Sequence, residues 1–114
     1  MAISKGKVCE ALSLTYTKRM RILGIDPGTG ILGFGVIDVD GAKHGSFKMV
    51  DAGVVTTPPH TPHDERLEDI FTSLTEIIEA TKPDVCSVEK LFFTRNITTA
   101  MSVAEARGVA LLVA

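Results

Sequence analysis

Apolar positions in the first half of the chain follow the spacing of β-strands. Residues 21–26 form a short apolar run that stops at a Pro-Gly pair, and residues 31–39, rich in Val, Ile and Phe, end at an Asp-Gly pair. Residues 47–56 form a third such run before a Pro-Pro pair. Short runs bounded by these turn signals are typical of strands. The pattern predicts three strands in an antiparallel meander.

The spacing then becomes helical. Apolar residues recur three and four positions apart along one stripe, formed by Leu67, Ile70, Phe71, Leu74, Ile77 and Ile78. This stripe predicts an amphipathic helix. Thr61 is the expected N-cap and Pro62 the first helical residue, and Lys82-Pro83 is expected to stop the helix.

The last part of the chain predicts one more strand and one more helix. Residues 84–89 are apolar until the final acid, and from about Ile97 the chain is Ala-rich and apolar on nearly all sides. Such a helix is normally buried. A helical crossover makes the fourth strand parallel to one of the first three, with a right-handed connection. The predicted fold class is α/β, a mixed sheet with strands 1–3 antiparallel, strand 4 parallel, and flanking helices.

Residues 1–19 show no sustained periodicity, and Met20 fits a natural start. We expect an N-terminal extension, disordered, outside a domain of residues 20–114. The extension carries four Lys/Arg and one Glu, a charge of +3, whereas residues 20–114 carry 8 basic and 13 acidic residues, a charge of −5. Overall charge therefore does not favour nucleic-acid binding by the domain.

Composition indicates a soluble, cytoplasmic protein without a membrane partner. No segment approaches the roughly 18 consecutive apolar residues of a membrane helix, and the first residues lack the apolar core of a secretory signal. Two cysteines, Cys9 and Cys86, are too few for a disulfide scaffold. The sequence stops at Ala114 without a helix C-cap, which predicts further sequence beyond it.

Two acids close apolar runs: Asp26 ends the first predicted strand and Glu89 the fourth. If strand 4 lies beside strand 1, both acids reach the same edge of the sheet, where such sheets bind ligands. Neighbouring carboxylates repel, and a divalent cation relieves the repulsion. Oxygen ligands suit Mg²⁺ or Mn²⁺. Spacing alone favours the plainer interpretation of an Asx-turn at Asp26 and a surface acid at Glu89.

Three blocks resemble the RuvC-type Holliday-junction resolvases: RILGIDPGTGILGFGVID, VEKLFFTRN and AEARGVALLVA. They occur in family order between Met20 and Ala114. The resemblance implies an RNase H-like fold and a structure-specific endonuclease that uses Mg²⁺, with Mn²⁺ as a substitute, to cut four-way DNA junctions in recombination and repair. It also implies a homodimer and, as a further partner, a branch-migration helicase complex.

The resemblance carries Asp26 and Glu89 over as catalytic, metal-binding carboxylates. It also implies that a loop contacts DNA, with an aromatic side chain that stacks on a base and polar neighbours that reach phosphates. The expected DNA-binding residues are Lys90, Phe92, Arg95 and Asn96. From the residues alone, Phe92 fits packing between strand and helix equally well. For Arg95 a solvated loop charge is the plainer interpretation.

The chain departs from the family in one respect. The family's remaining acidic ligands come from a later helix that has no counterpart in this sequence. His60 and His63 precede the first helix and are expected to be exposed loop residues rather than substitutes. The 114-residue chain is therefore expected to bind metal weakly and to cut poorly or not at all. Arg107 is expected to support the fold.

Three other functions fit parts of the sequence. Gly28, Gly30 and Gly33 match a dinucleotide fingerprint, but that motif needs a helix where a strand is predicted. Residues 24–29 (GIDPGT) also fit the phosphate loop of the actin and sugar-kinase ATPases, which share the core fold. The aromatic loop favours the nuclease over these ATPases. The third alternative is a non-catalytic fragment that dimerises or binds junction DNA.

Overall fold

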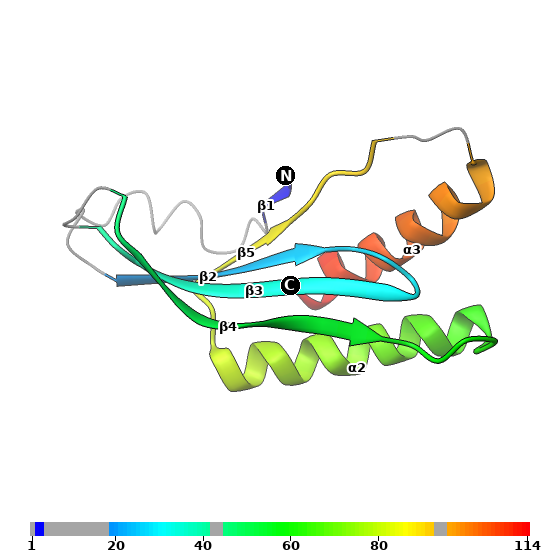
Figure 1. Cartoon of the computed structure of the whole chain (residues 1–114), viewed down its shortest axis with the longest axis horizontal. Coiled ribbons are helices and arrows are strands. Elements are labelled where there is room, and N and C mark those ends of the chain that lie inside the picture. The colour runs from blue at the N-terminus through cyan, green and yellow to red at the C-terminus, as the bar shows by residue number, and fades with distance from the viewer. Residues whose placement is uncertain (1, 4–18, 42–44, 93–95) are drawn as a thin grey trace.

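The computed structural model describes residues 2–3, 19–41, 45–92 and 96–114. These residues form one five-stranded sheet, in the order β1-β5-β2-β3-β4, and two helices (Figure 1). The elements in chain order are β1 (Ala2–Ile3), β2 (Arg19–Asp26), β3 (Ile31–Asp40), β4 (Phe47–Thr56), α2 (His63–Thr81), β5 (Val85–Val88) and α3 (Ile97–Val113).

The sheet has the predicted mixed topology. β2 pairs with β3 and β3 with β4, both antiparallel, with a bulge between Val36 and Ile37. β5 pairs with β2 in parallel, so that Ile25 lies opposite Val88. The prediction of three antiparallel strands and a parallel fourth strand beside the first is therefore confirmed. The strand β3 directly after the turn also excludes the dinucleotide fingerprint, which requires a helix there.

The N-terminal residues contribute a strand that the sequence did not predict. β1 pairs antiparallel with β5, and Ala2 lies opposite Val88. β2 begins at Arg19, one residue before the expected domain boundary. Residues 4–18 lie outside the described residues, so the division into an extension and a domain stays a prediction.

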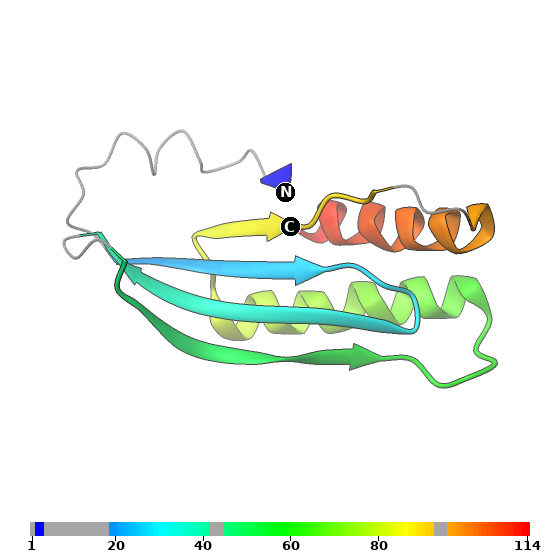
Figure 2. The same cartoon turned by 45° about the horizontal axis from the view of Figure 1, so that its top comes forward.

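Both helices pack on the same face of the sheet (Figure 2). Side chains alternate between the two faces of a strand, and one set from β2, β3 and β5 meets the helices. The resulting core consists of Leu23, Ile25, Leu32, Val36, Ile70, Leu74, Cys86, Val88, Ala106 and Ala110. Burial of each large apolar side chain contributes about 1.5–3 kcal/mol, so this layer supplies much of the stability. Neither described helix is long and apolar enough to cross a membrane.

α2 begins one residue later than predicted. Its N-cap is Pro62, and the Thr61 hydroxyl donates instead to the Pro58 carbonyl at 2.8 Å. The prediction of Thr61 as the cap is therefore wrong, because a turn within the preceding loop already uses this hydroxyl. The predicted stop is confirmed: Lys82 takes a left-handed backbone conformation (φ 48°) and its N–H caps the Ile78 carbonyl.

α3 is less buried than its composition suggested. Only Ala106 and Ala110 are fully enclosed, whereas the exposed fractions of Ile97, Met101 and Leu112 are 74%, 59% and 78%. The prediction of a buried helix is wrong for the described structure, because α2 and the sheet cover a single stripe of α3.

Arg21 connects three elements at the start of β2. Its Nε and Nη2 donate to the two carboxylate oxygens of Asp38 on β3, at 2.7 and 3.0 Å. Its Nη1 donates to the Thr81 carbonyl at the end of α2, at 2.7 Å. Asp84 accepts from the Arg21 backbone N–H. This arrangement fixes α2 and the start of β5 against the end of the sheet opposite Asp26.

The Arg21–Asp38 pair predicts a pH dependence. The hydrogen bond from Arg21 lowers the pKa of Asp38 below its ordinary range. The stabilisation is thus present above the pKa of Asp38 in the unfolded chain and is lost as the pH falls through the lower folded value. In urea titrations, Asp38→Asn should lower the free energy of unfolding at neutral pH. It should also reduce the further decrease of that free energy as the pH falls. The control Asp69→Asn, on exposed α2 surface, should do neither; equal pH profiles for Asp38→Asn and wild type would contradict this role.

Candidate active site

Asp26 and Glu89 are brought together by the parallel pairing of β2 and β5. Asp26 is the last residue of β2, and Glu89 directly follows β5. The Glu89 N–H donates to the Ile25 carbonyl at 2.9 Å, which extends the ladder by one bond beyond the Ile25–Val88 pair. The geometric prediction that these two acids end neighbouring strands at one edge is confirmed.

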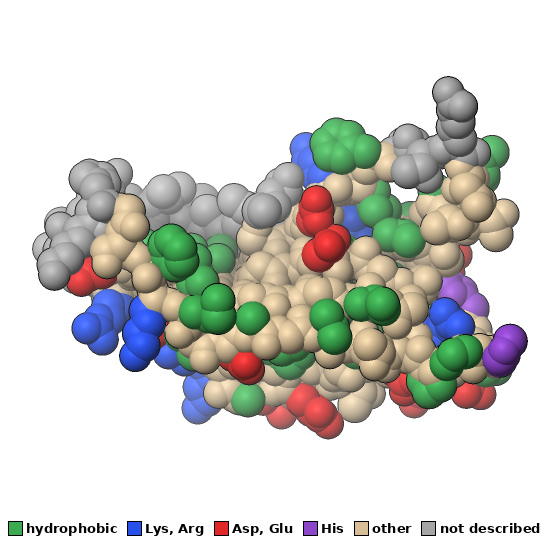
Figure 3. Space-filling model, in the orientation of Figure 1, with side chains coloured by type: hydrophobic (Ala, Val, Ile, Leu, Met, Phe, Trp, Pro, Cys, Tyr) green, Lys and Arg blue, Asp and Glu red, His purple; other side chains and the backbone are tan. Residues whose placement is uncertain are grey.

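Both carboxylates extend from the face of the sheet that the described helices leave uncovered. Ile25 and Val88 point into the core, so the next residues, Asp26 and Glu89, point the opposite way. A Cβ placed at Gly33, which pairs with Asp26, would lie 3.7 Å from the Asp26 Cβ. Asp26 and Glu89 are both exposed, and acidic side chains gather near the middle of the view in Figure 3. The acids are therefore accessible to a large ligand.

The two carboxyl groups interact directly. A hydrogen bond with Asp26 raises the pKa of Glu89, and the negative charge of Asp26 and partial desolvation raise it further. Two carboxylates that repel in this way favour either a shared proton or a bound cation. Their oxygens suit a hard divalent cation. Within the described ranges, however, no third His, Cys, Asp or Glu joins them.

The turn after Asp26 is fixed by backbone contacts. A Cβ added at Gly28 would lie 2.1 Å from the Ile31 carbonyl oxygen, so the chain passes too close here for any side chain. The Thr57 hydroxyl donates to the Thr29 carbonyl at 2.8 Å, and the Thr57 N–H donates to the Gly30 carbonyl at 3.1 Å. The end of β4 thereby holds the turn that follows the first acid. Sequence analysis did not identify this role of Thr57.

Glu89 is also held from the helix side. The Nε–H of Arg107, on α3, donates to the Glu89 backbone carbonyl at 3.0 Å. This contact was missed at the sequence level, where Arg107 was assigned to the fold in general. Its only signal was that Arg107 is the single basic residue of α3.

Three of the four residues expected to contact DNA are described, and all three are exposed: Lys90, Phe92 and Asn96. Lys90 is exposed, and Phe92 is 85% exposed, so the alternative that Phe92 packs between strand and helix is wrong. Asn96 is the N-cap of α3, and its side chain accepts from the Thr99 N–H at 3.4 Å. Arg95 lies outside the described residues. DNA contacts by these four residues stay a prediction.

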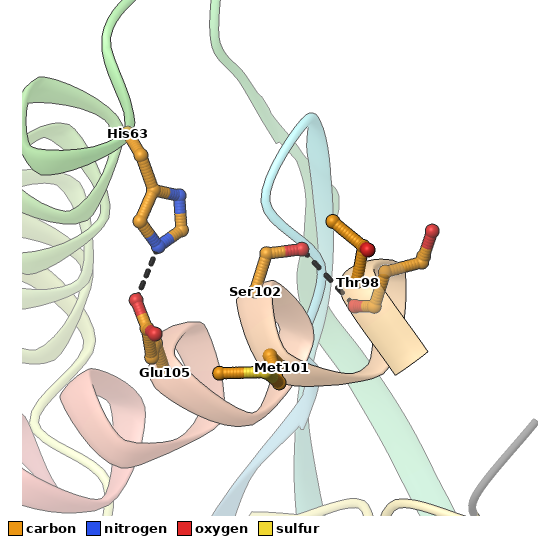
Figure 4. A pocket seen from close by; sticks show the side chains of 6 residues that line it. His63, Thr98, Met101, Ser102 and Glu105 are labelled. Atoms are coloured by element: carbon orange, nitrogen blue, oxygen red, sulfur yellow. Dashed lines mark hydrogen bonds and ion pairs between the residues drawn. The ribbon is translucent and has the colours of Figure 1, made fainter. Parts of the chain in front are cut away.

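Among the described residues, His60 and His63 form no metal-binding group with the carboxylate pair. His60 and His63 are exposed, as expected, but His63 is the first residue of α2 rather than a loop residue. It pairs with Glu105 of α3 beside an open groove of about 440 Å³ (Figure 4). Thr98, Thr99, Met101 and Ser102 complete the groove lining. The His63–Glu105 pair joins the first turn of α2 to α3.

Comparison with known proteins places this arrangement in a family. A family model described as crossover junction endodeoxyribonuclease RuvC matches residues 22–114. The chain belongs to the RuvC family. Similar relatives include the RuvC proteins of Chloroflexus aurantiacus and Chloroflexus aggregans, 47% and 50% identical over 93 residues, and that of Thermotoga petrophila, also 47% identical. The family match decides against the actin and sugar-kinase interpretation.

A solved RuvC structure shows the same fold. Thermus thermophilus RuvC in complex with a Holliday junction substrate matches with a TM-score of 0.74 and 34% identity, over 82% of this chain and 58% of that one. The predicted RNase H-like fold is thereby confirmed. The alignments cover 82% of this chain and 54–55% of these three RuvC relatives, so the chain spans about half their length.

Proposed function

We propose that this chain forms the part of a junction-resolving endodeoxyribonuclease that binds four-way DNA and supplies two carboxylates to its cation site. The observation that carries the proposal is the Asp26–Glu89 pair, held at adjacent strand ends on the open face of the sheet. Family membership supports it, because the matching family is that of crossover junction endodeoxyribonucleases.

The donor chemistry of the pair fits a divalent metal, and we propose Mg²⁺, with Mn²⁺ as a substitute. Asp26 and Glu89 would hold the cation through carboxylate oxygens. The cation would take the place of the hydrogen bond with Asp26 and offset the charge of Asp26, the two largest causes that raise the pKa of Glu89. A bound cation of this kind can activate water and stabilise the leaving oxygen in phosphodiester hydrolysis. Two carboxylates alone make a weak site, so the 114-residue chain is expected to cut junctions poorly or not at all.

The loop from Lys90 to Asn96 is proposed to position the DNA beside the carboxylates. The Lys90 ammonium neutralises phosphate charge, and the Arg95 and Asn96 side chains add polar contacts. The exposed Phe92 ring stacks on a base. We also propose that the complete enzyme acts as a homodimer and with a branch-migration helicase complex.

Phe92→Ala tests the DNA-binding role. Because the ring is 85% exposed, its removal should leave the urea midpoint unchanged. Loss of one stacked base, worth about 1–3 kcal/mol, should weaken binding to a synthetic four-way junction roughly 5- to 150-fold in a gel-shift assay with Ca²⁺. Leu112→Ala is the matched control, since Leu112 is 78% exposed on α3 and lies outside the proposed DNA loop. Equal junction affinity for both variants would contradict the role of Phe92.

The same gel, together with a measurement of Mn²⁺ binding, separates the remaining functions. Preference for a four-way junction over linear duplex, without cleavage in Mg²⁺, is the result expected of this chain. It also fits the non-catalytic alternative, which is favoured if Asp26→Asn leaves Mn²⁺ binding unchanged. Efficient junction resolution by the wild-type chain would show that two carboxylates suffice and would overturn our expectation of weak activity. Equal affinity for junction and duplex would overturn the proposed substrate.

A further inference from the structure

The Glu89 backbone is held on both sides by different elements. Its N–H donates to the Ile25 carbonyl of β2, and its carbonyl accepts from the Arg107 Nε–H of α3. β5 ends at Val88, so Glu89 is the first residue beyond the strand. Without the arginine, its carbonyl would lose the contact that joins it to the helical layer. The two bonds hold the peptide groups on either side of the Glu89 Cα, so they restrict the direction in which the Glu89 side chain leaves the backbone.

Arg107 is well placed to fix the peptide group that contains the Glu89 carbonyl. It directly follows Ala106, which is fully buried, and lies three residues before Ala110, which is also fully buried. These small side chains seat α3 against the core, so the start of the Arg107 side chain is anchored. The planar guanidinium then offers an N–H of fixed direction, and less conformational freedom is lost than for a lysine making the same bond.

We propose that Arg107 is a positioning residue for the cation site: its bond to the Glu89 carbonyl holds the Glu89 carboxylate against Asp26. This inference rests on the proposed cation site and adds a residue to it. Arg107 touches neither carboxylate in this role. It transmits the position of α3 to the end of β5, so that helix packing and cation binding are linked.

Arg107 could affect cation binding by positioning Glu89 or only through its own positive charge. These two roles predict opposite changes in cation affinity when Arg107 is replaced. Removal of a positive charge near a cation site, taken alone, strengthens cation binding. Loss of a group that orients a ligand weakens it, typically 10- to 100-fold. The test is Mn²⁺ titration of the 114-residue chain, followed by paramagnetic broadening of the Glu89 side-chain signals in NMR spectra. Unfolding by urea is measured in parallel.

Arg107→Gln is expected to raise the Mn²⁺ dissociation constant about 10-fold. Arg107→Lys keeps the charge but has no donor at the ε position, so it should weaken Mn²⁺ binding to the same extent. It is the second variant if Arg107→Gln fails to fold. Arg66→Gln is the matched control. The Arg66 Nε also donates to a backbone carbonyl, that of Thr61, at 3.0 Å, but on the loop before α2. Arg66→Gln should lower stability and leave Mn²⁺ affinity unchanged.

Two results would overturn the inference. One rejects the role of Arg107 alone, and the other rejects the cation site as well. If Arg107→Gln or Arg107→Lys lowers the urea midpoint but leaves Mn²⁺ affinity unchanged or improved, Arg107 is structural only and the cation site stands. If the wild-type chain shows no broadening of Glu89 by millimolar Mn²⁺ while distant residues behave normally, the cation site itself is wrong, and the inference fails with it.

Discussion

Replacement of Gly28 by alanine is expected to lower the free energy of unfolding by about 2–3 kcal/mol, as overpacking against rigid atoms does. The added Cβ would lie 2.1 Å from the Ile31 carbonyl oxygen, and this neighbour is backbone that cannot rotate away. Relief requires the turn between β2 and β3 to open, which breaks its contacts with Thr57. Urea denaturation followed by circular dichroism measures the loss.

Gly35→Ala is the control for this substitution. Gly35 lies inside β3, and a Cβ there would meet nothing within 4 Å. Glycine in a strand interior costs about 0.5–1 kcal/mol relative to alanine, so Gly35→Ala should be neutral or slightly stabilising. A similar loss for both variants would show that the close approach at Gly28 is not what restricts the turn.

Asp26→Asn is expected to change stability and cation binding in opposite directions. Asp26 raises the pKa of Glu89, so the folded chain holds the Glu89 proton more tightly than the unfolded chain. The resulting stabilisation is present below the unfolded pKa and is lost as the pH rises through the raised folded value. Above that raised value the charge of Glu89 beside Asp26 therefore destabilises the fold. Asparagine removes the repulsion and, with it, half of the cation's carboxylate ligands.

Measurements at several pH values can check both effects of Asp26→Asn. At neutral pH the urea midpoint should rise, whereas Mn²⁺ broadening of the Glu89 signals should disappear. Glu68→Gln, on the exposed surface of α2, makes the same change in net charge away from the pair. It should leave Mn²⁺ binding intact. If Asp26→Asn lowers stability at neutral pH or retains Mn²⁺ binding, the two carboxylates do not act as one site.

The strand ends and the acid pair could be predicted because their signals are local. Each strand of the meander is an apolar run that stops at a turn sequence, and each acid closes such a run. One further assumption, that the fourth strand lies beside the first, was enough to place Asp26 next to Glu89. The helical crossover restricted that choice, since it makes the fourth strand parallel to its partner.

Most of the missed features depend on contacts that form only in the folded structure. The Arg107–Glu89 bond joins residues 18 positions apart and exists only once α3 has docked on the sheet. The Thr61 cap failed because a neighbouring carbonyl, that of Pro58, competes for the same hydroxyl. Exposure along α3 could not be read from its apolar composition, because composition does not tell which neighbours are present. Pairing of β1 with β5 involves two residues, too few to show a period.

The outer strand β4 has a consequence for how the molecule behaves in concentrated solution. It is ten residues long, pairs on one side only within the described sheet, and is exposed along nearly its whole length. A long strand of this kind is a template for strand-to-strand association, which charged side chains oppose. Lys48 and Asp51 supply such charges, whereas Phe47, Met49 and Val54 stay exposed between and beside them. A second strand laid along this edge would take Lys48 and Asp51 out of water, and the cost of removing that hydration restrains self-association.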